Sequence, residues 1–134
     1  MVKPDNEAER IVINFFETLS TGDLDRVYEC MHPDCTWNVL VTVPGTGSYK
    51  GRDKIVEFLG PIRGQFMPGD PKINIYRVIS KDDWVAVESR GSGHFKNGLE
   101  YKNNYSWVLQ VKDGAVYEIR EYMDSYYVST LDLS

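Results

Sequence analysis

Residues 72–124, KINIYRVISKDDWVAVESRGSGHFKNGLEYKNNYSWVLQVKDGAVYEIREYMD, decide the fold of this chain. Apolar, β-branched and aromatic residues alternate with polar ones along this stretch, a pattern typical of strands with one buried face. Short turns divide it, and two of them contain Asn-Gly or Asp-Gly, the dipeptides favoured in tight hairpins. Within the second strand, Gly91-Ser92-Gly93 predicts a bulge or bend that helps the sheet to curl. We predict an antiparallel meander of strands near residues 72–80, 84–94, 99–111 and 115–124.

The chain before residue 72 is mainly helical. Apolar residues spaced three and four apart predict a helix over residues 8–19, a shorter one over 24–31 that ends at His32-Pro33, and a third over 53–62. Between them, residues 35–43, CTWNVLVTV, are typical of a strand. Helices that precede a long meander indicate the α+β class, with the helices laid against one face of the sheet.

The predicted fold is therefore α+β, with three N-terminal helices packed on a strongly curved, mainly antiparallel sheet. A length of 134 residues suits one domain over residues 1–134. Long strands twist, and helices that close the mouth of a curled sheet would leave a blind apolar pocket. The chain has 9 Tyr, 5 Phe and 3 Trp, enough rings to fill a core, line such a pocket or form an interface.

Charge and cysteine content exclude several classes of partner. The formal net charge is −5 and no basic run stands out, so we expect no nucleic-acid binding. No stretch of about 18 apolar residues is present, and MVKPDNEAER lacks the apolar part of a secretory signal, so we expect a cytoplasmic protein without membrane contact. Cys30, His32 and Cys35 raise the alternative of a metal site, but a structural zinc usually has four ligands, and two buried thiols are the favoured interpretation. We expect no metal and no other cofactor.

The last strand offers one candidate catalytic residue, Glu121. By the two-residue period of a strand, it shares the more apolar face with Tyr117, Ile119 and Met123. A carboxyl group in such surroundings is desolvated, which raises its pKa and suits it to acid or base catalysis near neutral pH. Two alternatives stay open: Glu121 is solvated or paired with an arginine at the pocket mouth, or the opposite face of this strand enters the pocket.

The strand before it carries a row of rings and one amide on a single face: Tyr101, Asn103, Tyr105, Trp107 and Leu109. Such a row is typical of a ligand pocket with a polar handle, the alternatives being plain core or an aromatic dimer surface. The predicted substrate-binding residues are Phe15, Trp37, Asn103, Tyr105, Trp107, Tyr117 and Met123. Tyrosine is enriched at interfaces, so Tyr122, Tyr126 and Tyr127 are candidates for a subunit interface.

Three motifs give the chain a resemblance to a known family. They are Thr21-Gly22-Asp23-Leu24, Tyr49-Lys50-Gly51-Arg52-Asp53, and the ending from Lys112-Asp113-Gly114-Ala115-Val116 to Arg120-Glu121-Tyr122-Met123-Asp124. With the order of elements, they resemble the nuclear transport factor 2-like superfamily and its SnoaL-like, ketosteroid-isomerase-like branch. The resemblance implies a cone-shaped sheet, a deep apolar pocket and a homodimer formed through the sheet. It leaves the chemistry open, because the superfamily includes isomerases, cyclases, hydrolases, dehydratases and non-catalytic binders.

The active sites of that superfamily match this chain only in part. Steroid isomerases carry a tyrosine and an aspartate at positions that resemble Phe15 and Val39 here. The epoxide hydrolase positions resemble Trp37, Val39, Ser89 and Gly91. Only the acid of the last strand keeps a counterpart, Glu121.

These residues lead to a first functional hypothesis and two alternatives. The first is a cofactor-independent isomerase, cyclase, hydratase or hydrolase acting on a small hydrophobic cyclic molecule. Glu121 would be the acid or base, and Tyr105, Asn103 and Trp107 would orient the substrate. The alternatives are a non-catalytic module that binds a small ligand in the same pocket, and a protein-interaction module of the same fold.

Overall fold

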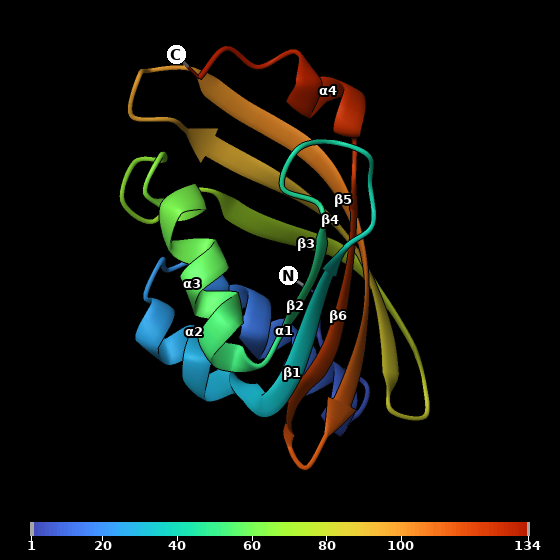
Figure 1. Ribbon diagram of the computed structural model, residues 1–134. Coiled ribbons are helices and arrows are strands. Elements are labelled where there is room, and N and C mark those ends of the chain that lie inside the picture. Colours follow the sequence, from blue (N-terminus) through green and yellow to red (C-terminus); the bar gives the residue numbers. More distant parts are fainter. Residues whose placement is uncertain (1, 134) are drawn as a thin grey trace.

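The computed structural model describes residues 2–133, which form an α+β structure around one six-stranded mixed sheet (Figure 1). The helices are α1 (Glu7–Leu19), α2 (Leu24–Cys30), α3 (Arg52–Arg63) and α4 (Ser125–Ser129). The strands are β1 (Met31–Val39), β2 (Gly47–Lys50), β3 (Lys72–Lys81), β4 (Trp84–His94), β5 (Glu100–Lys112) and β6 (Ala115–Met123). The sheet order is β2-β1-β6-β5-β4-β3. The α+β class predicted from the sequence is confirmed.

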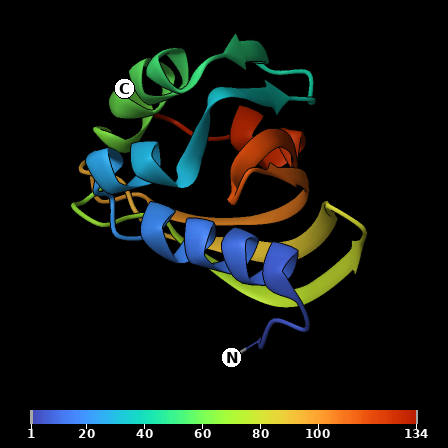
Figure 2. The same cartoon turned by 90° about the horizontal axis from the view of Figure 1, so that it is seen from below.

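Strands β3 to β6 form the predicted meander, with each strand antiparallel to the next. Strand β1 then pairs with β6 in parallel, and β2 adds an antiparallel edge, so the sheet is open rather than closed. Figures 1 and 2 show the sheet bending around the side on which α1, α2 and α3 lie. This bend places side chains from β1, β5 and β6 opposite those of the helices.

The largest buried side chains lie where the helices meet the sheet. Phe15 and Phe16 of α1 are fully buried, and the side chains of Trp37 in β1 and Trp107 in β5 are each 2% exposed. The ring centroids of Phe16 and Trp107 are 4.9 Å apart, and those of the two tryptophans are 5.8 Å apart and nearly perpendicular. Edge-to-face contacts of this kind add to the stabilisation that burial of the rings provides. A large part of the aromatic content therefore forms the core.

Several boundaries differ from those predicted. Helix α2 ends at Cys30, and the residues expected to close it, His32 and Pro33, already belong to β1. Strand β2 and helix α4 were not predicted, because β2 has only four residues and α4 only five. Such short elements carry too few residues to show a period.

The glycines of β4 do not form the predicted bulge. The pairing of β4 with β5 continues without a shift through Gly91 and Gly93, whereas the irregularity lies between Ile75 and Arg77 of β3. Gly91 has a different role, since a Cβ atom there would lie 2.8 Å from Cε1 of Tyr105. The glycine makes room for the tyrosine ring against the sheet.

Candidate active site

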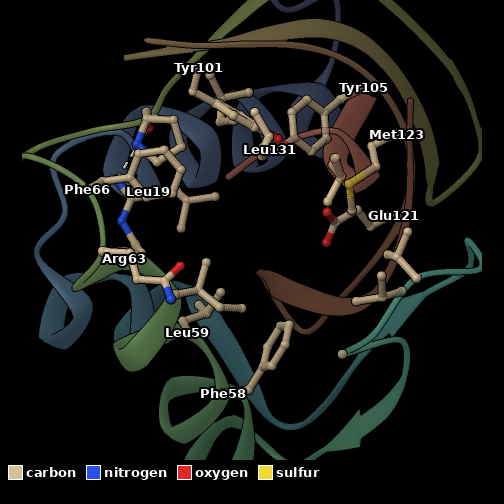
Figure 3. Close-up of a pocket in the computed structure, with 18 of the residues that line it drawn as sticks. Leu19, Phe58, Leu59, Arg63, Phe66, Tyr101, Tyr105, Glu121, Met123 and Leu131 are labelled. Carbon is tan, nitrogen blue, oxygen red and sulfur yellow. Dashed lines mark hydrogen bonds between the residues drawn. The ribbon is translucent and has the colours of Figure 1, made fainter. Parts of the chain in front are cut away.

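A cavity of about 320 Å³ lies between the inner face of the sheet, α3 and the C-terminal segment (Figure 3). This volume is at the lower end of the range of roughly 300–1,000 Å³ found for small-molecule pockets. Most of its wall is apolar, and its ionisable or phenolic groups are Arg63, Tyr101, Tyr105 and Glu121. The cavity therefore suits a small, mainly hydrophobic ligand that offers a few polar atoms.

Glu121 lies on the cavity-facing side of β6 and is only 7% exposed. In Figure 3 its carboxyl group points into the cavity. The indole Nε1 of Trp37 donates a hydrogen bond of 2.7 Å to its Oε1. Burial raises the pKa of Glu121 to about 7, while the bond from Trp37 acts in the opposite direction. A carboxyl group with this pKa can both accept and donate a proton at neutral pH.

The sheet register explains why Glu121 and the tryptophans meet. Glu121 stands opposite Trp107 on β5 and beside Val39 on β1, so it has apolar neighbours on both sides. The indole Nε1 of Trp107 donates to Oγ of Ser89, at 3.0 Å, and is therefore not available to the carboxyl group. Trp37 is thus the indole that stabilises the ionised form of Glu121.

Two tyrosine hydroxyls form a second polar group in the wall. The Oη atoms of Tyr101 and Tyr105 are 2.5 Å apart, and Nδ2 of Asn103 donates to Tyr101 Oη at 3.0 Å. Burial raises the pKa of both tyrosines, so both hydroxyls are protonated at neutral pH. The pair shares one hydrogen bond, so one of the two hydroxyl hydrogens is not used within it. The ring of Tyr105 stacks on Trp107, at 5.2 Å and 8°, which fixes its orientation.

Arg63, in the last turn of α3, was not identified from the sequence. Figure 3 shows it along the wall across the cavity from Glu121. One guanidinium nitrogen, Nη2, donates to the carbonyl oxygen of Pro71 at 3.3 Å. Its Nε is buried and has no hydrogen-bond partner within residues 2–133. The signal was present, because Arg63 follows the buried Leu59 by four residues and so lies on the same face of the helix.

The predicted site residues divide into those that line the cavity and those that do not. Trp37, Tyr105, Trp107, Glu121 and Met123 line it. Phe15 is buried against Trp37, and Asn103 is buried and bonded to Tyr101, so both contact lining residues without lining the cavity themselves. The sequence did not identify the contributions of α3 and the C-terminal segment, among them Phe58, Leu59, Val128 and Leu131.

Tyr117 lies outside the cavity. The β5–β6 register shifts between Gln110 and Val111, so the strict two-residue alternation does not extend from Glu121 back to Tyr117. Val116 is buried in its place. The Tyr117 ring instead packs nearly perpendicular to the His32 ring, with 5.1 Å between centroids, and Nζ of Lys112 lies 4.8 Å from the Tyr117 centroid.

The remaining candidates lie away from the cavity. Within residues 2–133, no group of three or more His, Cys, Asp or Glu side chains is arranged to hold a metal ion. Burial raises the pKa of the Cys35 thiol to about 12. Of the C-terminal tyrosines, Tyr127 is engaged within the chain, since its hydroxyl accepts a hydrogen bond from the Lys102 amide at 3.1 Å. Tyr126 is 79% exposed and Tyr122 is also exposed.

Solved structures share this fold. The TerC protein co-crystallised with polyporic acid has a TM-score of 0.81 at 17% identity, covering 94% of this chain and 98% of that one. Bal32a, from a soil-derived mobile gene cassette, has a TM-score of 0.77 at 25% identity, covering 91% and 95%. A candidate SnoaL-like polyketide cyclase from Jannaschia sp. CCS1 has a TM-score of 0.77 at 20% identity, covering 97% and 95%. The architecture is thus that of the nuclear transport factor 2-like proteins.

The sequence itself matches a family model. The model of the SnoaL-like domain matches residues 12–119, which include most of the helices and the sheet. The chain belongs to the SnoaL-like domain family. No curated protein is similar enough in sequence to match it. None of the helices within residues 2–133 is long and apolar enough to cross a membrane.

Proposed function

We propose that the cavity catalyses cofactor-independent proton transfer on a small hydrophobic cyclic molecule, as an isomerase, cyclase, hydratase or hydrolase. The observation that carries this proposal is the buried carboxyl group of Glu121, which is hydrogen-bonded by Trp37 and points into an apolar cavity. Its pKa of about 7 gives comparable amounts of base and acid at neutral pH. Perturbed carboxyl groups in clefts are concentrated at functional sites.

The proposed step uses groups on two sides of the ligand. The Glu121 carboxylate takes a proton from a carbon next to a carbonyl group, and the electron pair of that C–H bond moves to form the enolate. The remaining hydroxyl hydrogen of the Tyr101 and Tyr105 pair bonds to the enolate oxygen. The protonated Glu121 then returns its proton to another carbon or to the oxygen, and the carboxylate is restored. Cyclisation would begin from the same enolate, and addition of water would use protonated Glu121 as the proton donor.

Structural neighbours support the chemistry without assigning it. One is a candidate SnoaL-like polyketide cyclase, another is a candidate isomerase from Bacillus subtilis, and TerC was crystallised with polyporic acid. Their sequence identities to this chain, 20% or lower, show the fold alone. The proposal therefore rests on the residues around Glu121 rather than on these names.

The second candidate is a non-catalytic small-ligand binder. It is favoured by Phe15 and Val39, which stand where the resemblance to steroid isomerases places a tyrosine and an aspartate. A homodimer in the cytoplasm, formed through the outer face of the sheet, is part of both candidates. The exposed Tyr122 on β6 supports an interface there, and light scattering of the wild type and Tyr122→Glu tests it.

Hydrogen exchange on bound ligands separates the two candidates. Steroids, polyketides, terpenes and aromatic acids are first screened for a rise in melting temperature, since a ligand of the native state stabilises it. Each hit with hydrogens next to a carbonyl group is then incubated in D₂O and followed by NMR. We expect exchange that Glu121→Gln reduces at least about 100-fold, the usual scale of acid or base catalysis. Glu118→Gln, on the same strand outside the cavity, is the matched control.

The two outcomes are distinct. Exchange that depends on Glu121 and not on Glu118 supports the enzyme. A ligand that binds to wild type and Glu121→Gln alike, with no exchange in either, rejects the enzyme in favour of the binding module.

A further inference from the structure

The apolar wall of the cavity contains a cation. Arg63 lines the cavity among Leu59, Ile62 and Phe66, and its Nε is buried without a hydrogen-bond partner within residues 2–133. Burial lowers the pKa of Arg63, an effect that Asp70 and Tyr105 oppose. A guanidinium nevertheless stays charged in proteins. The wall thus holds a fixed positive charge.

No carboxylate among residues 2–133 forms a direct ion pair with this charge. Against the effect of burial, the Asp70 carboxylate raises the pKa of Arg63 without an ion pair, and its Oδ2 accepts a hydrogen bond from the His94 amide at 3.0 Å. A partly desolvated cation with no counter-ion in direct contact is unfavourable, so the site favours an anion that can reach it.

The opposite wall does not repel an anion strongly. Glu121 lies across the cavity from Arg63 and is protonated in about half of the molecules at pH 7, given its pKa of about 7. The tyrosine hydroxyls between the two walls are neutral at this pH because burial raises the pKa of both. Arg63 therefore makes the electrostatic potential of the cavity positive.

The chemistry of the cation also selects the anion. A guanidinium presents N–H groups in a planar fork that fits the two oxygens of a carboxylate. A phosphate dianion would need further donors, and Arg63 is the only Lys or Arg among the described lining residues. The volume of about 320 Å³ leaves space for a small ring system beside the anionic group.

We propose that the ligand of this cavity is a small aromatic or cyclic carboxylate, with its carboxylate on the Arg63 guanidinium and its ring between Arg63 and Glu121. This proposal rests on the proposed function for the site, and it adds the substrate class. Arg63 is thereby a residue that determines specificity, and the reacting carbon is the one that the bound carboxylate places near Glu121.

Equilibrium binding tests the proposal without turnover. The probes are 2-naphthoate and its neutral counterpart 2-naphthamide, titrated at pH 7 and followed by NMR chemical shifts. Wild type should bind naphthoate at least about tenfold more tightly than naphthamide, which is the usual scale of one charge-assisted pair. Arg63→Gln and Arg63→Met should reduce naphthoate affinity to that of naphthamide and change the amide affinity less than about threefold.

The variants separate charge from structure. Arg63→Met keeps the long apolar stem, so a fold that depends on packing is retained even if Arg63→Gln is unstable. Arg90→Gln removes an exposed arginine that does not line the cavity and should leave both affinities unchanged. Thermal unfolding of each variant verifies that it is folded.

The outcomes distinguish this inference from the proposed function. Equal affinity of wild type for the two probes, binding of neither probe, or a carboxylate preference that survives in Arg63→Met would overturn it. Glu121→Gln should retain the preference for naphthoate. If no Glu121-dependent exchange is seen but the preference for naphthoate is present, the enzyme alone is rejected. If Glu121-dependent exchange is seen but the preference for naphthoate is absent, the carboxylate ligand alone is rejected.

Discussion

The indole Nε1 of Trp37 and Oε1 of Glu121 are joined by a 2.7 Å hydrogen bond at the wall of the cavity. Trp37 is 2% exposed and Glu121 is 7% exposed, so this bond forms where water has little access. Burial disfavours the carboxylate, and the indole N–H favours it. The balance of the two effects keeps the pKa of this carboxyl group close to neutral pH, where proton transfer in both directions is easiest.

Removing the indole donor should raise the pKa of Glu121 further above 7. Phenylalanine in Trp37→Phe keeps an apolar ring but donates no hydrogen bond, so the carboxylate loses its stabilising partner while burial remains. NMR titration of the Glu121 carboxyl carbon measures the change.

Trp107→Phe is the matched control for that variant. It also shortens a buried tryptophan, and each substitution should lower the free energy of unfolding by roughly 1–3 kcal/mol. Trp107 donates to Ser89, so its loss should leave the pKa of Glu121 nearly unchanged. Equal shifts in both variants would show that the indole bond of Trp37 has no specific effect.

Glu121 should also make the stability of the protein depend on pH. Its pKa rises from an ordinary 4.5 to about 7 on folding, so between these pH values the folded state holds a proton that the unfolded state has released. The stabilising contribution of Glu121 to the free energy of unfolding is complete below pH 4.5 and is lost as pH rises through 7. Wild type should therefore lose on the order of 3 kcal/mol relative to Glu121→Gln between pH 4.5 and pH 8.

Urea unfolding of both proteins across this range gives the difference. Subtracting the variant removes the contributions of the other titrating groups, provided that both unfold in one transition. Glu118→Gln should show no such relative change. If the difference in the free energy of unfolding between wild type and Glu121→Gln does not depend on pH, burial does not raise the pKa of this carboxyl group.

Gly91→Ala should disturb the cavity through Tyr105. The added methyl group would lie 2.8 Å from Cε1 of Tyr105, so the ring must move from its stacked position on Trp107. We expect a loss of roughly 1–3 kcal/mol in the free energy of unfolding and weaker binding of 2-naphthamide. Gly60→Ala in α3 meets nothing within 4 Å and should instead stabilise the helix by up to about 1 kcal/mol. Unchanged probe affinity in Gly91→Ala would indicate that Tyr105 does not shape the binding site.

Local sequence patterns were sufficient to predict the meander and the face of the last strand on which Glu121 lies. Hairpin dipeptides fix where strands turn, and a two-residue period places Tyr105, Trp107 and Glu121 on one side of the sheet. The same period misplaced Tyr117, because the shift between Gln110 and Val111 is set by pairing between strands and leaves no local mark. The sequence places Arg63 on the same face of α3 as Leu59, but its position across from Glu121 depends on how α3 packs on a curved sheet.

The most direct test of the account is the pKa of the Glu121 carboxyl group, measured by NMR titration of its ¹³Cδ resonance in the folded protein, with Glu121→Gln to assign the signal. We expect a value of about 7, with the resonance still titrating where the exposed carboxyl groups have finished. A value near the ordinary 4.5 would show a solvated carboxylate and would contradict the role of Glu121 as the acid and base of this cavity.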